Sequence, residues 1–204
     1  MSKAIKITKG LDLKLYGEPT PEVVETFVSE YALKPKDFIG LTPKLLIEEG
    51  ERVKAGTPLF YAKGKEKVLF TSPVSGVVKQ VKRGEKRVIE EVIVSADETI
   101  EYLDFGVSSI SELNAEQIKE KMLLSGAWTL LRQRPYSVVP NPDTTPKCII
   151  VSGFSSAPLA PDYSILLKGL GAELQVGVDA LKKMTGVTIH VNVPSQDVRA
   201  EELT

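Results

Sequence analysis

The sequence predicts a β-sandwich followed by an α/β layer with parallel strands. Three observations support this prediction. Apolar residues and glycines alternate at intervals of three between Ile47 and Leu59, and the stretch from Val74 to Gly84 has a similar pattern. In the last third of the chain, an apolar strand, a helix and an alternating strand follow one another. Glycine supplies the positive φ of tight turns, and a strand–helix–strand unit places its two strands in parallel.

The first predicted domain comprises residues 1–102, with a core module at residues 45–94. Ahead of the module, Ile5 and Ile7 alternate in a short strand. The run from Val23 to Leu33 is rich in Val, Thr, Phe and Tyr, which are typical of strands. Residues 1–102 are therefore expected to be mainly β-structure.

Residues 103–142 are predicted to form one helix and a proline-bearing connector. Asn114 is a suitable N-cap, because Gln117 stands three residues later in the capping-box position. Ile118 and Met122 share one face of the helix, and Gly126 ends it. After the helix, prolines 135, 140 and 142 indicate a connector on the surface.

Residues 143–204 are predicted to form a Rossmann-like βαβ region. Its first strand is Cys148–Val151, its helix runs from Asp162 to Thr185, and its second strand runs from Val187 to Val193. The polar end, Ser195–Thr204, follows that strand without a packing helix, so we expect the chain to be part of a longer protein. The helix should bury one stripe of side chains, namely Leu166, Leu170, Leu174, Val178 and Leu181.

Composition excludes several classes of function. The 26 basic and 27 acidic side chains give no overall attraction to nucleic acid or to anionic lipid. A single cysteine, Cys148, excludes an internal disulfide and a cysteine zinc cluster. No run of about 18 apolar residues is present, so no direct membrane span is expected.

No residue pattern indicates a catalytic site or a metal site. The loop after Val151 contains one glycine and two prolines instead of the glycine fingerprint of a nucleotide site, so a structural βαβ layer is favoured over nucleotide binding. The lone His190 lies in an alternating strand, where histidine is usually packed or solvated. Cys148 is interpreted as a small apolar residue of the core.

Two clusters are candidates for docking a partner. The first cluster surrounds one turn of the β-module and comprises Lys79, Lys82, Arg83, Lys86 and Arg87. It is interpreted either as a docking site for an acidic partner or as an ordinary solvated surface. The second contains Trp128, Arg132 and Arg134, residue types that often anchor protein interfaces. Its alternative is internal: Trp128 packs between two regions and the arginines cap or pair locally.

The core module resembles the lipoyl/biotinyl domains, which form a barrel-sandwich hybrid. Val81-x-x-Gly84 repeats Ile47-x-x-Gly50 34 residues later, as in the two similar halves of those domains. Carrier domains present a modified lysine at the tip of their central hairpin. The corresponding segment here, residues 62–67, contains three lysines without the flanking methionines of biotin carriers. A scaffold is therefore favoured over a covalent carrier module.

Five motifs narrow the resemblance, and they occur in fixed order. They are IKITKGLDL at residues 5–13, RGEKRV at 83–88, SGAWTLLRQRPYS at 125–137, KCIIVSGF at 147–154 and APLA at 157–160. Together they resemble the N-terminal portion of the A subunit of the bacterial sodium-translocating NADH:quinone reductase.

This resemblance implies a peripheral, cytoplasmic subunit on the inner face of the bacterial cell membrane. The complex couples NADH oxidation and ubiquinone reduction to sodium export. The resemblance also implies that this portion carries no cofactor, because the flavins and the iron–sulfur centre lie on other subunits. Those subunits are its expected partners, and ubiquinone is a further possible partner. An electron-transport subunit of the ferredoxin–NAD oxidoreductase type is the alternative.

Overall fold

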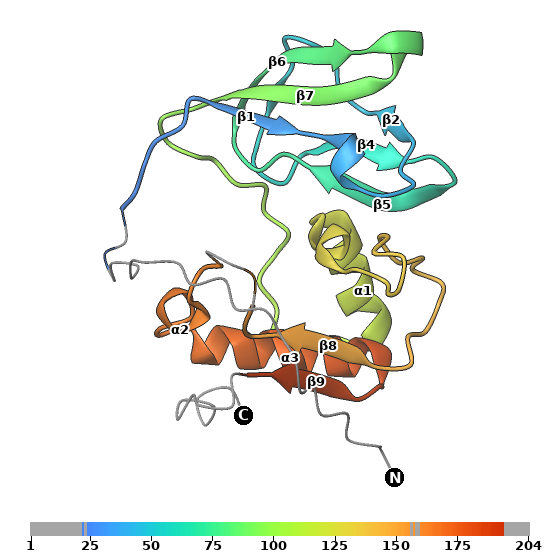
Figure 1. Ribbon diagram of the computed structural model, residues 1–204, viewed down its shortest axis with the longest axis vertical. Helices are drawn as coiled ribbons and strands as arrows, with labels where there is room; N and C mark the ends of the chain where they lie inside the picture. Colours follow the sequence, from blue (N-terminus) through green and yellow to red (C-terminus); the bar gives the residue numbers. More distant parts are fainter. Residues whose placement is uncertain (1–21, 23, 156, 158–159, 194–204) are drawn as a thin grey trace.

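The fold consists of a β-module and an α/β part joined by a helical connector (Figure 1). The computed structural model describes residues 22, 24–155, 157 and 160–193. The predicted strand around Ile5 and Ile7 and the polar end from Ser195 lie outside the described residues. Within the part of the chain that is described, no helix is long and apolar enough to cross a membrane.

Two antiparallel sheets build the β-module. The first has four strands in the order β1-β7-β6-β3, and the second has three in the order β2-β4-β5. Short 3-10 turns occur at residues 35–37 and 85–87. The strand bounds are β1 Glu30–Leu33, β2 Pro43–Leu45, β3 Arg52–Val53, β4 Pro58–Ala62, β5 Lys65–Thr71, β6 Gly76–Arg83 and β7 Ile89–Ala96.

The inner faces of the two sheets form one apolar core. Phe60 of β4 and Phe70 of β5 are fully buried and stack with ring centroids 4.9 Å apart. Three valines of the opposite sheet complete the core beneath these rings: Val78, Val92 and Val94. Aromatic pairs of this kind add stability beyond the area they bury.

The three-residue spacing corresponds to alternating core residues and turns, as predicted. Ile47, Val53 and Leu59 are buried, whereas Gly50 and Gly56 have φ values of +87° and +97°. The repeat is less regular than its sequence suggests, because Gly84 adopts an extended conformation with φ −91°.

The connector begins with α1, Ala115–Leu124, whose predicted capping box is confirmed. The Gln117 amide N–H donates to Asn114 Oδ1, and the Asn114 amide N–H donates to Gln117 Oε1, both at 2.9 Å. Gly126 follows the helix at φ +79°, a left-handed conformation that glycine adopts at least cost. The helix packs against β5 on one side and against α3 of the α/β part on the other (Figure 1).

The α/β part contains a two-stranded parallel sheet, which confirms the predicted βαβ arrangement. Strand β8, Ile149–Ser152, pairs in parallel with β9, Ile189–Asn192. The predicted continuous helix is wrong, since it divides into α2, Tyr163–Leu166, and α3, Gly171–Thr185. Gly169, at φ +80°, lies in the break. As a result Leu166 and Leu170 are exposed, and the other three residues of the predicted buried stripe, Leu174, Val178 and Leu181, are only half-buried.

The strand formed by the run from Val23 to Leu33 is also shorter than its composition suggests. Only Glu30–Leu33 pairs with β7, although the strand-like composition begins at Val23. Val24 and Phe27 are exposed, so no neighbouring sheet covers the earlier residues of this run that the structure describes. The length of the strand is therefore set by pairing with β7, because composition gives only a tendency to form a strand.

Replacing Gly126 by alanine should destabilise the protein by about 1–3 kcal/mol. A Cβ there would stand 2.4 Å from Thr71 Oγ1, and the left-handed φ would add strain. Urea unfolding followed by the fluorescence of Trp128, the single tryptophan, would measure the change. The control is Gly177→Ala inside α3, where a Cβ meets nothing within 4 Å and helix propensity should raise stability slightly. Equal effects of the two substitutions would contradict the packing described for Gly126.

Candidate partner-docking surfaces

The first predicted cluster forms a basic tip on the hairpin between β6 and β7. Lys79 and Lys82 form ion pairs with glutamates of the same sheet. Lys79 pairs with Glu30, and Lys82 Nζ lies 3.7 Å from Glu91 Oε2. Three exposed cations remain for which no ion pair is found among the described residues: Arg83, Lys86 and Arg87. Lys79 and Lys82 are exposed as well, but each shares its charge with a glutamate of the sheet. We call Arg83, Lys86 and Arg87 the basic tip.

The backbone of the basic tip is strained. Lys86 and Arg87 have φ values of +55° and +61°, as the two central residues of a type I′ hairpin turn must have. The turn is closed by the Val88 amide N–H, which donates to the Glu85 carbonyl at 3.2 Å. Asparagine and glycine are preferred at these two positions, because most side chains lose about 1–2 kcal/mol in the left-handed region. The sequence thus presents two cations where a stable turn would favour Asn-Gly.

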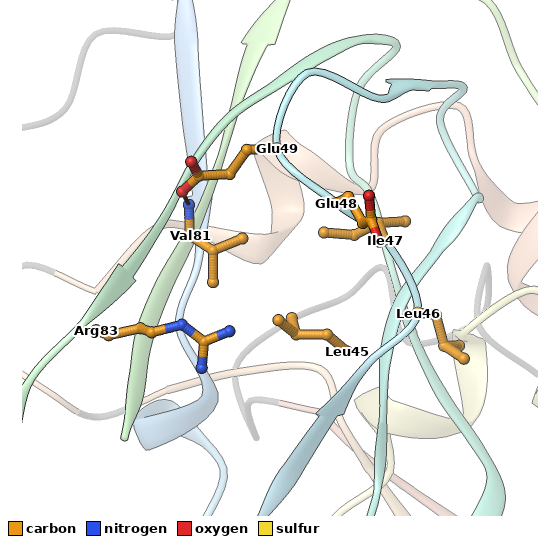
Figure 2. A pocket seen from close by; sticks show the side chains of 7 residues that line it. All are labelled: Leu45, Leu46, Ile47, Glu48, Glu49, Val81 and Arg83. Atoms are coloured by element: carbon orange, nitrogen blue, oxygen red, sulfur yellow. Dashed lines mark hydrogen bonds between the residues drawn. The ribbon is translucent and has the colours of Figure 1, made fainter. Parts of the chain in front are cut away.

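An open hollow lies beside the tip, between the end of β6 and the segment after β2 (Figure 2). Leu45, Ile47 and Val81 supply its apolar lining, and the Arg83 guanidinium points across it toward Leu45 (Figure 2). The Val81 amide N–H donates to the Glu49 carboxylate at 2.7 Å. This bond satisfies a backbone donor at the edge of β6, in the part of the strand that β3 does not cover. Such an open hollow does not enclose a small molecule as cofactor sites do.

The hairpin that corresponds to the carrier tip of lipoyl domains is fastened to the rest of the chain. Gly64, at φ +81°, makes the turn between β4 and β5. Beside it, the Lys63 amide N–H donates to the Thr42 carbonyl at 2.9 Å, and Lys65 Nζ donates to the Val139 carbonyl at 3.4 Å. Lys65 is half-buried and its amino group is held by this contact, whereas Lys63 and Lys67 are exposed.

In the second cluster, which contains Trp128, Arg132 and Arg134, the tryptophan is buried. Trp128 is 5% exposed and packs in the core cluster, and its indole N–H donates to the Pro140 carbonyl at 3.0 Å. This burial favours the internal alternative for Trp128, packing between two regions, over contact with a partner, because the ring has almost no surface left to offer.

The two arginines of this cluster differ in their surroundings. The Arg132 guanidinium lies 5.3 Å from the centre of the Phe38 ring and donates to the carbonyls of Thr129 and Leu131. Arg134 is exposed, and no ion pair is found for it among the residues described. Arg132 therefore holds the chain in place, whereas Arg134 is open to solvent.

Two exposed side chains of the same segment were not predicted from the sequence. Leu130 is 79% exposed and Tyr136 is 73% exposed. Both belong to the SGAWTLLRQRPYS motif, but a leucine beside a tryptophan suggests a core position. Only the orientation of the 3-10 turn at Ala127–Leu130 shows that Trp128 is directed inward and Leu130 outward.

The remaining candidate residues lie apart from both surfaces. His190 is an exposed residue of β9, and Cys148 is half-buried just before β8. In the loop after β8, Ser152 Oγ donates to the Phe154 carbonyl at 2.9 Å. Among the described residues, no group of three or more His, Cys, Asp and Glu side chains could hold a metal ion.

Comparison with known proteins identifies the family of the chain. Residues 5–97 match the NqrA N-terminal barrel-sandwich hybrid domain, and residues 113–204 match the NqrA second alpha/beta domain. The chain belongs to the NqrA family. The predicted fold class, a barrel-sandwich hybrid followed by an α/β region, is confirmed.

Individual members of the NqrA family are similar along most of this chain. The A subunit of the Na(+)-translocating NADH-quinone reductase of Serratia proteamaculans is 37% identical over 192 residues, which cover 92% of this chain and 43% of that protein. The protein of the same name from Pseudomonas aeruginosa is 37% identical over 186 residues, covering 90% and 42%. The one from Neisseria gonorrhoeae is 34% identical over 202 residues, covering 95% and 45%. The chain thus spans less than half the length of these relatives.

Replacing Lys86 by Asn together with Arg87 by Gly should raise the free energy of unfolding by about 1–2 kcal/mol. The reason is that the new residues adopt positive φ at lower cost. Urea unfolding would measure the gain. Lys67→Gly in β5, where the backbone is extended, is the control and should lose about 0.5–1 kcal/mol. A double variant no more stable than the parent would show that the turn is not strained.

Proposed function

We propose that this chain is the N-terminal portion of the A subunit of a bacterial sodium-translocating NADH:quinone reductase. In this proposal it is a peripheral subunit on the cytoplasmic face of the membrane, and the present portion assembles the complex without carrying out chemistry. The similarity to relatives named as this A subunit, at 37% identity over 92% of the chain, is the observation that carries the proposal.

The polar groups of the β-module support a structural role. Ser72 and Ser75 are buried, but both are satisfied internally: Ser72 Oγ donates to the Val74 carbonyl at 2.6 Å, and Ser75 Oγ donates to Asp97 Oδ2 at 2.8 Å. Throughout the described residues, every buried side-chain nitrogen or oxygen has a hydrogen-bond partner. Satisfied buried polar groups suit a structural module, because an unpaired polar group in a core lowers stability.

The proposal assigns the redox cofactors, flavins and an iron–sulfur centre, to other subunits. Those subunits are the partners of this portion, and ubiquinone is a further candidate ligand of the whole protein. The basic tip and the exposed Arg134 are the proposed contacts. An electron-transport subunit of the ferredoxin–NAD type is less favoured, because the matching domains and the names of the relatives agree on the A subunit of the sodium-translocating enzyme.

Deletion of the gene for the full-length protein should abolish sodium-stimulated NADH:quinone reduction in membranes of its host. A plasmid copy should restore the activity, and a copy of the Serratia proteamaculans relative should restore part of it. Oxygen uptake with succinate as the donor serves as the control and should not change. Full sodium-stimulated activity in the deletion strain would overturn the proposal.

The full-length protein purified from its host should carry no covalent or tightly bound redox group. We expect an intact mass that equals the sequence, because the lysines at residues 63–67 lie on a fastened hairpin, and no flavin absorption band. Mass spectrometry and an absorption spectrum would test both points. A lipoyl or biotinyl mass increment would establish the carrier alternative instead.

A further inference from the structure

We propose that Leu130, Arg134 and Tyr136 form a docking surface for an acidic, partly apolar segment of another subunit. This inference rests on the proposed function, which it deepens by naming the contact residues and the chemistry of the partner. We call these three side chains the connector patch.

Exposure of large apolar groups is the first observation. Leu130 is 79% exposed and Tyr136 is 73% exposed, although both follow a deeply buried tryptophan within the same motif. A single exposed leucine needs no explanation, but an exposed leucine, arginine and tyrosine within seven consecutive residues have the composition of an interface anchor. Tyrosine offers a large contact area and loses little side-chain entropy on binding.

Rigidity of the supporting backbone is the second observation. The Gln133 amide N–H donates to the Val138 carbonyl at 2.8 Å and closes the loop that carries Arg134 and Tyr136. Before the loop, Thr129 Oγ1 donates to the Gly126 carbonyl at 2.7 Å, and Arg132 is held over Phe38. Trp128, bonded to the Pro140 carbonyl, anchors both ends of the segment in the core. A surface ordered in advance loses less entropy when a partner binds.

Charge is the third observation, and it selects the kind of partner. No Asp or Glu occurs between Lys121 and Pro142, so the positive charge of Arg134 is not balanced within its own segment. The planar guanidinium of arginine matches a carboxylate with two parallel hydrogen bonds. The partner is therefore expected to place a carboxylate on Arg134 and apolar side chains against Leu130 and Tyr136.

A protein segment fits this surface better than an anionic membrane does. Electrostatic attachment to lipid typically uses clusters of roughly four to eight basic residues. The connector patch has one free arginine, since Arg132 already donates to two carbonyls and lies over Phe38. One charge in the same short segment as exposed apolar groups, on a backbone held by hydrogen bonds, suits the shaped surface of a protein.

The test measures how the full-length protein rebinds a reductase complex that has been depleted of it. Arg134→Glu and Tyr136→Ala should each weaken rebinding about tenfold or more, as loss of an interface anchor does. Tyr102→Ala is the matched control for the tyrosine, because Tyr102 is 74% exposed but lies outside the patch. Lys147→Glu is the control for charge reversal at an exposed site. Both controls should bind within about twofold of the parent.

Folding and the identity of the partner are checked separately. Trp128 fluorescence and the thermal midpoint should be unchanged in all four variants, because the altered side chains are exposed. Hydroxyl-radical footprinting should show Leu130 and Tyr136 reactive in the free full-length protein and protected in the complex. Protection already in the free protein would mean that its own chain covers the patch, and this would overturn the inference.

Other outcomes separate this inference from the proposed function. If the parent protein does not rebind the depleted complex, the proposed function fails. If the parent rebinds and both Arg134→Glu and Tyr136→Ala rebind equally well, only the connector patch is refuted. Binding of the free protein to anionic phosphatidylserine vesicles that is lost in Arg134→Glu would assign the patch to a membrane and overturn the partner named here.

Discussion

The burial of Trp128 is the contact on which the arrangement of this protein depends. Its ring belongs to the same apolar cluster as Phe60 and Phe70 of the β-module, and its indole N–H is satisfied by the Pro140 carbonyl. A buried indole donor needs such a partner, so the backbone after α1 must return to the ring. This one side chain therefore closes the connector onto the β-module. Leu123 of α1 and Met184 of α3 pack against the same cluster, which thus links all three parts of the described chain.

The β-module has the architecture of a barrel-sandwich hybrid, and its central hairpin is fastened to the rest of the chain. Its two sheets enclose a core of fully buried aromatic and branched residues. The hairpin that would hold a cofactor is instead bonded through Lys63 and Lys65 to neighbouring loops. This fastened hairpin contributes to a rigid platform, because its contacts with Thr42 and Val139 brace the loops around it.

The two candidate surfaces illustrate different ways of presenting positive charge. At the basic tip, Lys86 and Arg87 occupy a turn whose backbone geometry disfavours them, and glutamates of the same hairpin lie close in sequence. In the connector patch, Arg134 stands in a segment without acidic residues, which also carries the exposed Leu130 and Tyr136 and is held by internal hydrogen bonds. The second combination supplies both the attraction and the apolar area that a lasting contact requires, whereas charge alone mainly speeds encounter.

The sequence by itself determined the features that arise from local chemistry. Glycine spacing predicted the turns at Gly50 and Gly56, Asn114 and Gln117 predicted the start of α1, and the order of strand and helix predicted a parallel pair. These follow from backbone geometry and neighbouring hydrogen bonds, which a short window of sequence contains.

The tertiary structure alone decided which side chains of the connector face the core. Trp128 and Leu130 are two residues apart and both have large hydrophobic side chains, yet one is buried and the other is exposed. Their difference depends on the direction in which the 3-10 turn meets the β-module, and contacts distant in sequence set that direction.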